Sequence, residues 1–187
     1  DQQERLIHGV RIGGGLAAYQ GDISRNPNNN ILKYVGTAKP SILVGVDHRL
    51  GYYDQFGVGL DLVYTRLGGE TTGDVSFTNN MVSLDAYGDY ELPYIQQGLL
   101  RVFVGGGASF LISPSYQGFK SGDAWRPNLG TRVVGSFSVG VTIIDKIQVG
   151  ARFPTTDYLD GYRGFYEDPY PDVVSFVRFT HRFELRW

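Results

Sequence analysis

The chain has 187 residues, and its 17 Lys and Arg against 19 Asp and Glu give a formal net charge of −2. This balance argues against a nucleic-acid-binding protein, which normally has a basic excess. The absence of cysteine excludes disulfide scaffolds, thiol catalysis and Cys-based zinc sites. Gly accounts for 26 residues and aromatic residues for 14% of the chain, which favours an all-β protein, either soluble or an outer-membrane barrel. The length predicts one domain over 1–187.

Apolar residues alternate with polar or small residues in eight segments, and a period of two predicts β-strands. In the first segment Val10, Ile12 and Leu16 alternate with Arg11, Gly13 and Gly15. Strands of this length are long for a soluble sheet. The expected strands cover 9–19, 41–50, 56–65, 82–91, 100–110, 132–143, 147–153 and 177–187.

The connections between these segments alternate in length, which predicts an up-and-down antiparallel meander with all long loops at one end. The long connections are 21–37, 68–80, 112–127 and 154–172, and the short ones are 51–55, 92–98 and 144–146. A closed eight-stranded antiparallel barrel fits this order, and closure would remove the unpaired sheet edges. Such a barrel is either soluble, with its apolar face inside, or transmembrane, with its apolar face in lipid.

The glycines favour the transmembrane alternative, because small residues suit the crowded inner wall of a narrow barrel and weaken a strand on a hydrated surface. Four glycines share the apolar face: Gly14, Gly88, Gly106 and Gly135. Ten share the polar face: Gly9, Gly13, Gly15, Gly45, Gly57, Gly59, Gly105, Gly107, Gly140 and Gly150. The polar face is therefore expected to line the lumen.

Aromatic residues gather near both ends of the apolar face, as the two interfaces of a bilayer favour. The short-turn end has Tyr52, Tyr53, Phe56, Tyr90, Tyr94, Phe183 and Trp187. Tyr64, Phe110 and Phe153 lie towards the long-loop end, with Tyr116, Phe119 and Trp125 expected in the adjoining loop. The polar face carries charges of both signs, which we expect to pair in the lumen. This predicted network comprises Arg11, Asp47, Arg49, Asp61, Asp85, Asp89, Arg101, Arg152, Arg178, Arg182 and Glu184.

In this pattern the chain resembles the small eight-stranded outer-membrane barrels of Gram-negative bacteria, of the OmpX and OmpA membrane-domain type. The resemblance covers essentially the whole chain as an architecture, and its most specific part is the alternating C-terminal segment that ends in an aromatic residue. Phe179, Phe183, Leu185 and Trp187 are similar to the signal that delivers such proteins to the outer-membrane assembly machinery. The resemblance implies periplasmic chain ends and long extracellular loops, and it does not imply one function.

The histidines are the first place to look for catalysis. His8, His48 and His181 all map to the lipid-facing register near the short-turn end. Barrel deacylases of lipid A carry a His-x-Ser pair near the long-loop end, and neither His48 nor His181 has that serine. The interior expected here, lined with Arg, Asp and Gly, also differs from the hydrocarbon-lined pocket of palmitoyltransferase barrels. We therefore expect interfacial rather than catalytic histidines.

The last loop offers two candidate sites. Its carboxylates could bind calcium through oxygen ligands, but their spacing does not match an EF-hand, so we expect solvated loop charge and no metal. These are Asp157, Asp160, Glu167, Asp168 and Asp172. The loop aromatics suit a protein or glycan partner, although a girdle with loop self-packing is an equal alternative. They are Tyr158, Tyr162, Phe165, Tyr166 and Tyr170.

Together these features predict a non-enzymatic outer-membrane barrel that acts as a structural or docking component through its loops, with accessory membership of a larger complex as one form of that role. No cofactor is expected. Expected partners are outer-membrane lipid and lipopolysaccharide, the assembly machinery and other outer-membrane subunits, with no nucleic acid. The alternatives are a lipid A-modifying enzyme, a small pore and a soluble lipocalin-like ligand-binding barrel.

Overall fold

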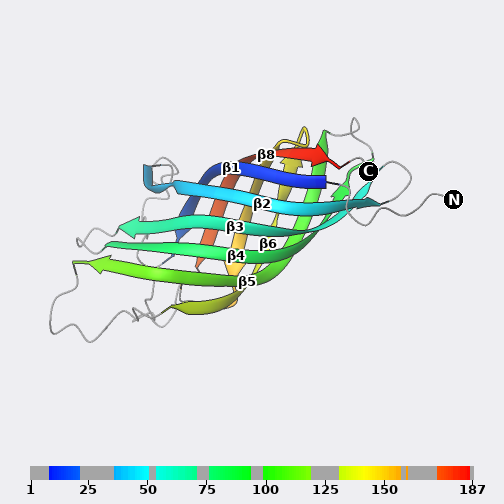
Figure 1. Cartoon of the computed structure of the whole chain (residues 1–187). Coiled ribbons are helices and arrows are strands. Elements are labelled where there is room, and N and C mark those ends of the chain that lie inside the picture. Colours follow the sequence, from blue (N-terminus) through cyan, green and yellow to red (C-terminus); the bar gives the residue numbers. More distant parts are fainter. Residues whose placement is uncertain are drawn as a thin grey trace.

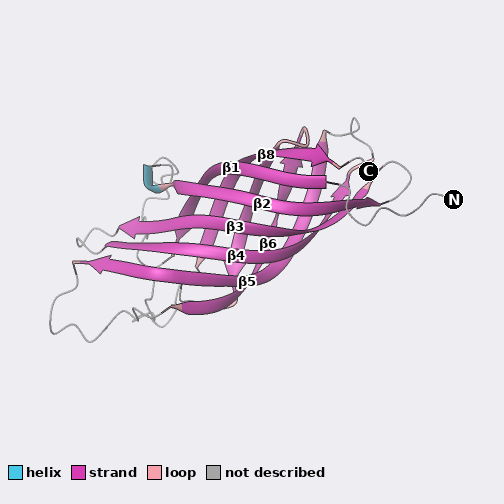
Figure 2. Cartoon of the chain, viewed as in Figure 1, coloured by secondary structure: helices cyan, strands magenta, loops and turns pink. Residues whose placement is uncertain are grey.

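The computed structural model is a closed barrel of eight strands in sequence order, and every neighbouring pair is antiparallel (Figure 1, Figure 2). It describes residues 9–21, 36–50, 54–70, 76–93, 99–118, 131–156, 159 and 172–185. The strands are β1 (Gly9–Gln20), β2 (Lys39–Leu50), β3 (Phe56–Glu70), β4 (Ser76–Glu91), β5 (Leu100–Gln117), β6 (Arg132–Ile143), β7 (Ile147–Pro154) and β8 (Val173–Glu184). Pairing of β1 with β8 closes the sheet, so the expected fold is confirmed.

The two faces of the wall carry opposite chemistry over most of its height. Leu60 is 51% exposed and Phe179 57% exposed, whereas Arg11 and Asp61 are each 6% exposed. Apolar side chains thus form an outward belt around the barrel, and charged side chains point into the lumen. This is the reverse of a soluble barrel, and it matches the alternation of a strand that faces lipid. No helix among the described residues is long and apolar enough to cross a membrane.

The strands are strongly staggered around the barrel. Tracing paired residues from Gly9 on β1 through every strand in turn leads back to β1 at Tyr19, ten residues further along. This shear tilts the strands, and because the diameter grows with strand number, a barrel of eight strands encloses little more than its own side chains. The stagger also decides which inward side chains meet across the lumen.

Gly15 lies where this narrow wall leaves no room for a side chain. A Cβ atom at Gly15 would overlap the carbonyl oxygen of Val177 and lie 2.6 Å from the Cα atom of Arg178 on β8. The neighbouring Gly14 faces outwards, and a Cβ atom added there would have no atom within 4 Å. The inward glycines therefore allow close backbone approach, as expected from their face of the strands.

Three strands are longer than the sequence predicts. The connections expected over 68–80 and 112–127 are wrong in large part, because β3 continues to Glu70, β4 begins at Ser76 and β5 continues to Gln117. These strands extend beyond the rest of the barrel at the end opposite the beginning of β1 (Figure 1). Here the alternation is inverted: Leu67, Phe77 and Met81 point inwards and are at most 3% exposed. Because the apolar residues change to the inner face here, the sequence pattern does not predict that the lipid-facing strands continue.

Tyr116 is a second correction, since it belongs to a strand and not to the expected loop. A register irregularity between Thr78 and Asn80 shifts the pairing of β4 with β5. It places Tyr116 opposite Phe77, with the two rings stacked 6.4 Å apart. The phenol joins the inner apolar cluster and accepts a hydrogen bond from Arg132 Nη2 at 3.3 Å. At the other end of the chain β8 also differs, beginning at Val173 and ending at Glu184 instead of covering 177–187.

Candidate functional site

The lumen is divided into three layers of different chemistry, and the layer near the beginning of β1 is a cluster of ion pairs. Arg101 is its centre, contacting Asp89 and Glu91 at 2.7 Å each and Asp145 at 3.0 Å. Asp89 also binds Arg49 at 2.6 Å. Three buried carboxylates, Asp47, Asp89 and Glu91, thus face three arginines, Arg49, Arg101 and Arg182. Each of the three arginines therefore has at least one carboxylate partner, which offsets the cost of burying its charge.

A cavity of about 300 Å³ opens beside this cluster, at the mouth of the barrel. Arg49, Arg101 and Arg182 line it together with Asp54, Asp145 and Glu184. Glu184 is a correction to the predicted lumen network, because its side chain is 62% exposed and lies 3.6 Å from Arg182. The strand ends at this residue, so Glu184 lies at the rim and not inside.

The middle layer contains two separate arginine–carboxylate pairs. Arg11 Nη2 donates to both carboxylate oxygens of Asp61, at 2.7 and 2.6 Å, and the guanidinium lies 4.1 Å from the centroid of the Tyr87 ring. Arg152 donates to Asp85 and, more weakly, to Ser109. Hydroxyl groups fill the remaining polar positions, with Ser41 bonded to Thr65, Ser83 to Ser109 and Ser109 to Ser136.

Arg178 is the third arginine of this layer, and it is 4% exposed. Its Nε atom donates to Ser41 at 3.1 Å, and its guanidinium stacks over Phe176 at 4.0 Å. Eight residues of the predicted lumen network are therefore buried inside the barrel: Arg11, Asp47, Asp61, Asp85, Asp89, Arg101, Arg152 and Arg178.

The third layer is apolar, which corrects the expectation of a lumen lined throughout with Arg, Asp and Gly. Tyr19 meets Phe77 edge-on, with ring centroids 4.8 Å apart, and Phe103 meets Phe176 at 6.3 Å. The cluster consists of Ala17, Tyr19, Leu67, Phe77, Met81, Phe103, Leu111, Val134, Leu159, Val174 and Phe176. It fills the lumen on the long-loop side, so we call it the apolar plug.

One residue of the last connection closes this plug. Leu159 is 1% exposed, although it lies between β7 and β8 rather than in a strand. Its backbone N–H donates to Asp172 at 2.6 Å, and its carbonyl oxygen accepts from Asn79 Nδ2 at 2.5 Å. Asp172 also accepts a hydrogen bond from the Tyr19 hydroxyl. The connection is thus anchored in the barrel, a feature that sequence reasoning missed because one Leu in a polar segment carries no periodic signal.

On the outer wall, aromatic pairs flank the apolar belt on both sides. Phe56 and Tyr90 lie 4.8 Å apart near the short turns, and Phe137 stacks on Phe153 at 5.0 Å towards the long connections. Of the predicted assembly signal, Phe179 and Phe183 face outwards, at 57% and 48% exposure. Leu185 is half-buried just after β8, and Trp187 lies outside the described residues.

The described histidines lie on the outer wall near the short turns, as predicted. His181 is exposed and meets the Phe183 ring edge-on at 4.5 Å, and His48 is half-buried. Five serines, Ser41, Ser83, Ser109, Ser136 and Ser138, point into the lumen on the other side of the wall. A nucleophile and its base must be within hydrogen-bond reach, so these serines cannot pair with either histidine. His8 lies outside the described residues.

The predicted partner-binding residues Tyr158, Tyr162, Phe165, Tyr166 and Tyr170 lie outside the described residues, as do Asp157, Asp160, Glu167 and Asp168. Asp172 is described and belongs to the Leu159 anchor rather than to a cluster of carboxylates. Within the described part of the chain, no group of three or more His, Asp or Glu side chains could hold a metal ion.

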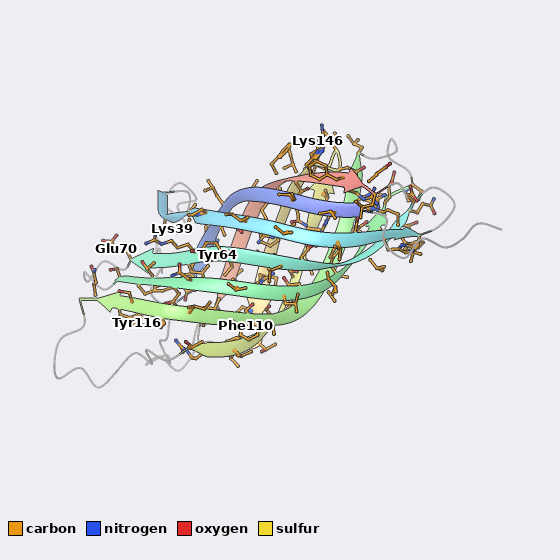
Figure 3. The ribbon with its side chains drawn as sticks, viewed as in Figure 1. Lys39, Tyr64, Glu70, Phe110, Tyr116 and Lys146 are labelled. Carbon is orange, nitrogen blue, oxygen red and sulfur yellow. The ribbon has the colours of Figure 1, made fainter. Side chains whose placement is uncertain are left out.

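The β3–β5 extension is the described surface that protrudes beyond the apolar belt. Among the described residues its strands pair only with one another there: β3 leaves β2 after Thr65, and β5 leaves β6 after Leu111. Lys39 lies against Gly68 at the β3 edge, and Arg132 bonds Tyr116 near the β5 edge. Figure 3 places Lys39, Glu70 and Tyr116 at this end of the barrel and Lys146 at the other. Charged residues at free strand edges limit non-specific sheet pairing.

No protein-family model and no curated protein matches the chain. Among solved structures it is similar to Ail, the attachment invasion locus protein of Yersinia pestis, crystallised with the heparin analogue sucrose octasulfate. That match has 13% identity, covers 94% of this chain and 97% of that chain, and has a TM-score of 0.47. For Neisserial surface protein A the identity is 13%, the coverage 95% and 96%, and the TM-score 0.44. At these identities the likeness concerns the fold alone.

Proposed function

We propose that this protein is a non-enzymatic outer-membrane barrel that presents its long-loop end as a docking surface, either alone or as an accessory subunit of a larger outer-membrane complex. The observation that carries the proposal is the division of the molecule into a filled barrel and a protruding β3–β5 extension. In such a barrel the wall supplies a rigid scaffold, and recognition resides in the segments that it holds.

The filled lumen supports a scaffold rather than a transport role. The apolar plug occupies one side of the lumen, and the ion pairs of Arg11 and Arg152 cross its middle. A solute would have to displace buried, paired charges and a packed aromatic cluster to pass. The outward belt supports residence in a bilayer. Our proposal further places the chain ends in the periplasm and the extension outside the cell.

The separation of the histidines from the buried serines supports a role without catalysis. A lipid-modifying barrel needs a nucleophile and a base on the same face of the wall, within reach of lipid. In the described part of the wall, His48 and His181 face outwards and the five buried serines face inwards. An assay of acyl-chain change on lipid A with the purified protein tests this part of the proposal, and turnover would overturn it.

Each surface of the barrel suits a different class of partner. The belt and its aromatic rims suit outer-membrane lipid and lipopolysaccharide, and Phe179 and Phe183 suit the assembly machinery during biogenesis. A protein or glycan partner would meet the aromatic residues of the last connection, with Tyr162, Phe165 and Tyr166 as anchors. No feature of charge or fold suits nucleic acid.

The deciding experiment replaces Tyr162, Phe165 and Tyr166 together with Ser and measures co-purification from native outer membranes in mild detergent. This design keeps Leu159 and Asp172, because removing all of 157–171 would also remove the buried anchor. We expect partner recovery to fall while heat-modifiable gel migration, the mark of a folded barrel, stays unchanged. The matched control is Lys146→Gln at the opposite end, which should retain every partner.

If the triple variant folds and keeps all partners, the last connection is not the docking surface. Orientation needs its own measurement, since docking outside the cell requires the extension to be there. A protease site inserted after Gly118 should be cut in intact cells, whereas one inserted at Lys146 should be cut only after the outer membrane is opened. The opposite result would overturn the proposed orientation.

A further inference from the structure

Arg178 differs from the other five arginines of the lumen network. Arg11, Arg49, Arg101, Arg152 and Arg182 each form at least one ion pair with a lumen carboxylate. Arg178 forms none within the described part of the chain, and its polar contact is the hydrogen bond from Nε to Ser41. It is nevertheless 4% exposed, so its charge is held away from bulk water.

The surrounding charges do not compensate for it. The nearby carboxylates, Asp61 and Asp85, already accept hydrogen bonds from Arg11 and Arg152. Among the described residues, the middle layer thus holds three arginines against two carboxylates, whereas every arginine of the mouth layer has a carboxylate partner. Because guanidinium does not give up its proton in proteins, the excess charge persists.

Arg178 and its neighbour Gln148 both carry polar atoms that can form further hydrogen bonds. In the described part of the chain, neither Nη atom of Arg178 makes a hydrogen bond, so the N–H groups of both atoms have donor capacity left for a ligand. Gln148 lies directly opposite Arg178 on β7 and is 4% exposed, and its Oε1 atom has no partner. Rotating that amide by half a turn would present its NH₂ group instead, since the two orientations have the same shape.

We propose that the lumen binds a small monovalent anion, chloride in the cell, between the Arg178 guanidinium and the Gln148 amide. The anion neutralises the excess positive charge of the middle layer and accepts hydrogen bonds from both Nη atoms. A water molecule would satisfy the N–H groups but not the charge, and burial makes an uncompensated charge costly. This inference does not depend on the docking role.

The direct test is a crystal of the wild-type protein refolded in bromide, examined by anomalous scattering. We expect a bromide peak in contact with the Arg178 guanidinium inside the lumen. A lumen without a peak, or peaks only on the outer surface, would overturn the proposal and leave water as the occupant. This measurement needs no variant, so it remains decisive even where a substitution prevents folding.

A second test measures thermal unfolding after refolding in sodium chloride or sodium gluconate at equal ionic strength, which separates binding from screening. We expect chloride to raise the wild-type unfolding temperature by a few degrees and to saturate, as linkage to a bound ligand requires. Arg178→Gln should lose this response. The matched control is Arg182→Gln, which removes a carboxylate-paired arginine from the mouth layer and should keep the response to chloride.

Gln148→Glu gives the opposite, gain-of-stability test. A carboxylate opposite Arg178 would take the place of the anion, so we expect this variant in gluconate to reach the unfolding temperature of the wild type in chloride. It should also show no further response to chloride. If Gln148→Glu destabilises the barrel in gluconate, or still responds to chloride, the anion does not lie at Arg178.

Discussion

At the scale of single residues, the depth of a side chain in the apolar belt decides what a charge costs there. Leu60 lies on β3 midway between the outward aromatic residues Phe56 and Tyr64, and it is 51% exposed. Leu60→Arg should lower the free energy of unfolding by roughly 2–4 kcal/mol, because its charge would sit near the bilayer midplane. Denaturant unfolding in lipid vesicles measures this loss.

The matched control is the same substitution at Leu50, which also faces outwards but pairs with Phe56 at the edge of the belt. Leu50→Arg should cost only about 0–1 kcal/mol, because its charge can reach the interface. Equal losses at the two positions would contradict the placement of the belt.

Close backbone approach makes a second residue-scale prediction, for two neighbouring glycines on β1. Gly15→Ala should lower the free energy of unfolding by about 1–3 kcal/mol, because the added methyl group would collide with the β8 backbone, which cannot move without breaking the wall. Gly14→Ala adds the same methyl group into open space on the outer face and should be close to neutral. Unfolding of both variants under the same conditions checks the pair, and a neutral Gly15→Ala would mean that β1 and β8 are further apart.

At the scale of elements, the connection between β7 and β8 behaves as part of the core through one residue. Leu159→Ala should lower the free energy of unfolding by about 2–5 kcal/mol, the range for a fully buried Leu, although the residue is not in a strand. A surface-loop Leu would cost almost nothing. Tyr19→Phe keeps the ring against Phe77 and removes only the hydroxyl that donates to Asp172, so it should cost less than Leu159→Ala.

The strands show how far the sequence reaches and where it stops. Eight strands, their order and their inward faces follow from the period of two, because lipid outside and charge inside leave a strong alternation. The outer part of β3–β5 does not follow from the sequence, because its alternation is inverted, with Phe77 and Met81 inside. The partners of individual arginines also escape the sequence. Arg11 meets Asp61 two strands away, and only the stagger of the closed barrel brings them together.

At the scale of the whole molecule, the side of the wall that carries the apolar residues changes along the barrel axis. Over the height of the belt, charged groups lie inside and apolar groups lie outside, the reverse of a water-soluble protein. Towards the long connections the interior under the β3–β5 extension is apolar, as in a water-soluble protein. The change coincides with the end of the outward aromatic rim, where lipid would give way to water. The apolar plug is therefore the hydrophobic core of the extension, and it continues into the lumen. The same packing that stabilises the extension also blocks this end of the barrel.

This sealing gives the last prediction, which concerns conduction. In planar bilayers the wild-type protein should show no steady conductance of porin size, because the apolar plug and the ion pairs of the middle layer both block the lumen of this eight-stranded barrel. Leu159→Ala should not open it either, since the pairs Arg11–Asp61 and Arg152–Asp85 still cross the middle. A porin recorded in the same bilayers serves as the positive control, and heat-modifiable migration shows that the inserted barrel is folded. Stable conductance steps of porin size from the folded wild type would mean that the lumen is open in the resting state. That result would contradict the scaffold role and favour a transport function.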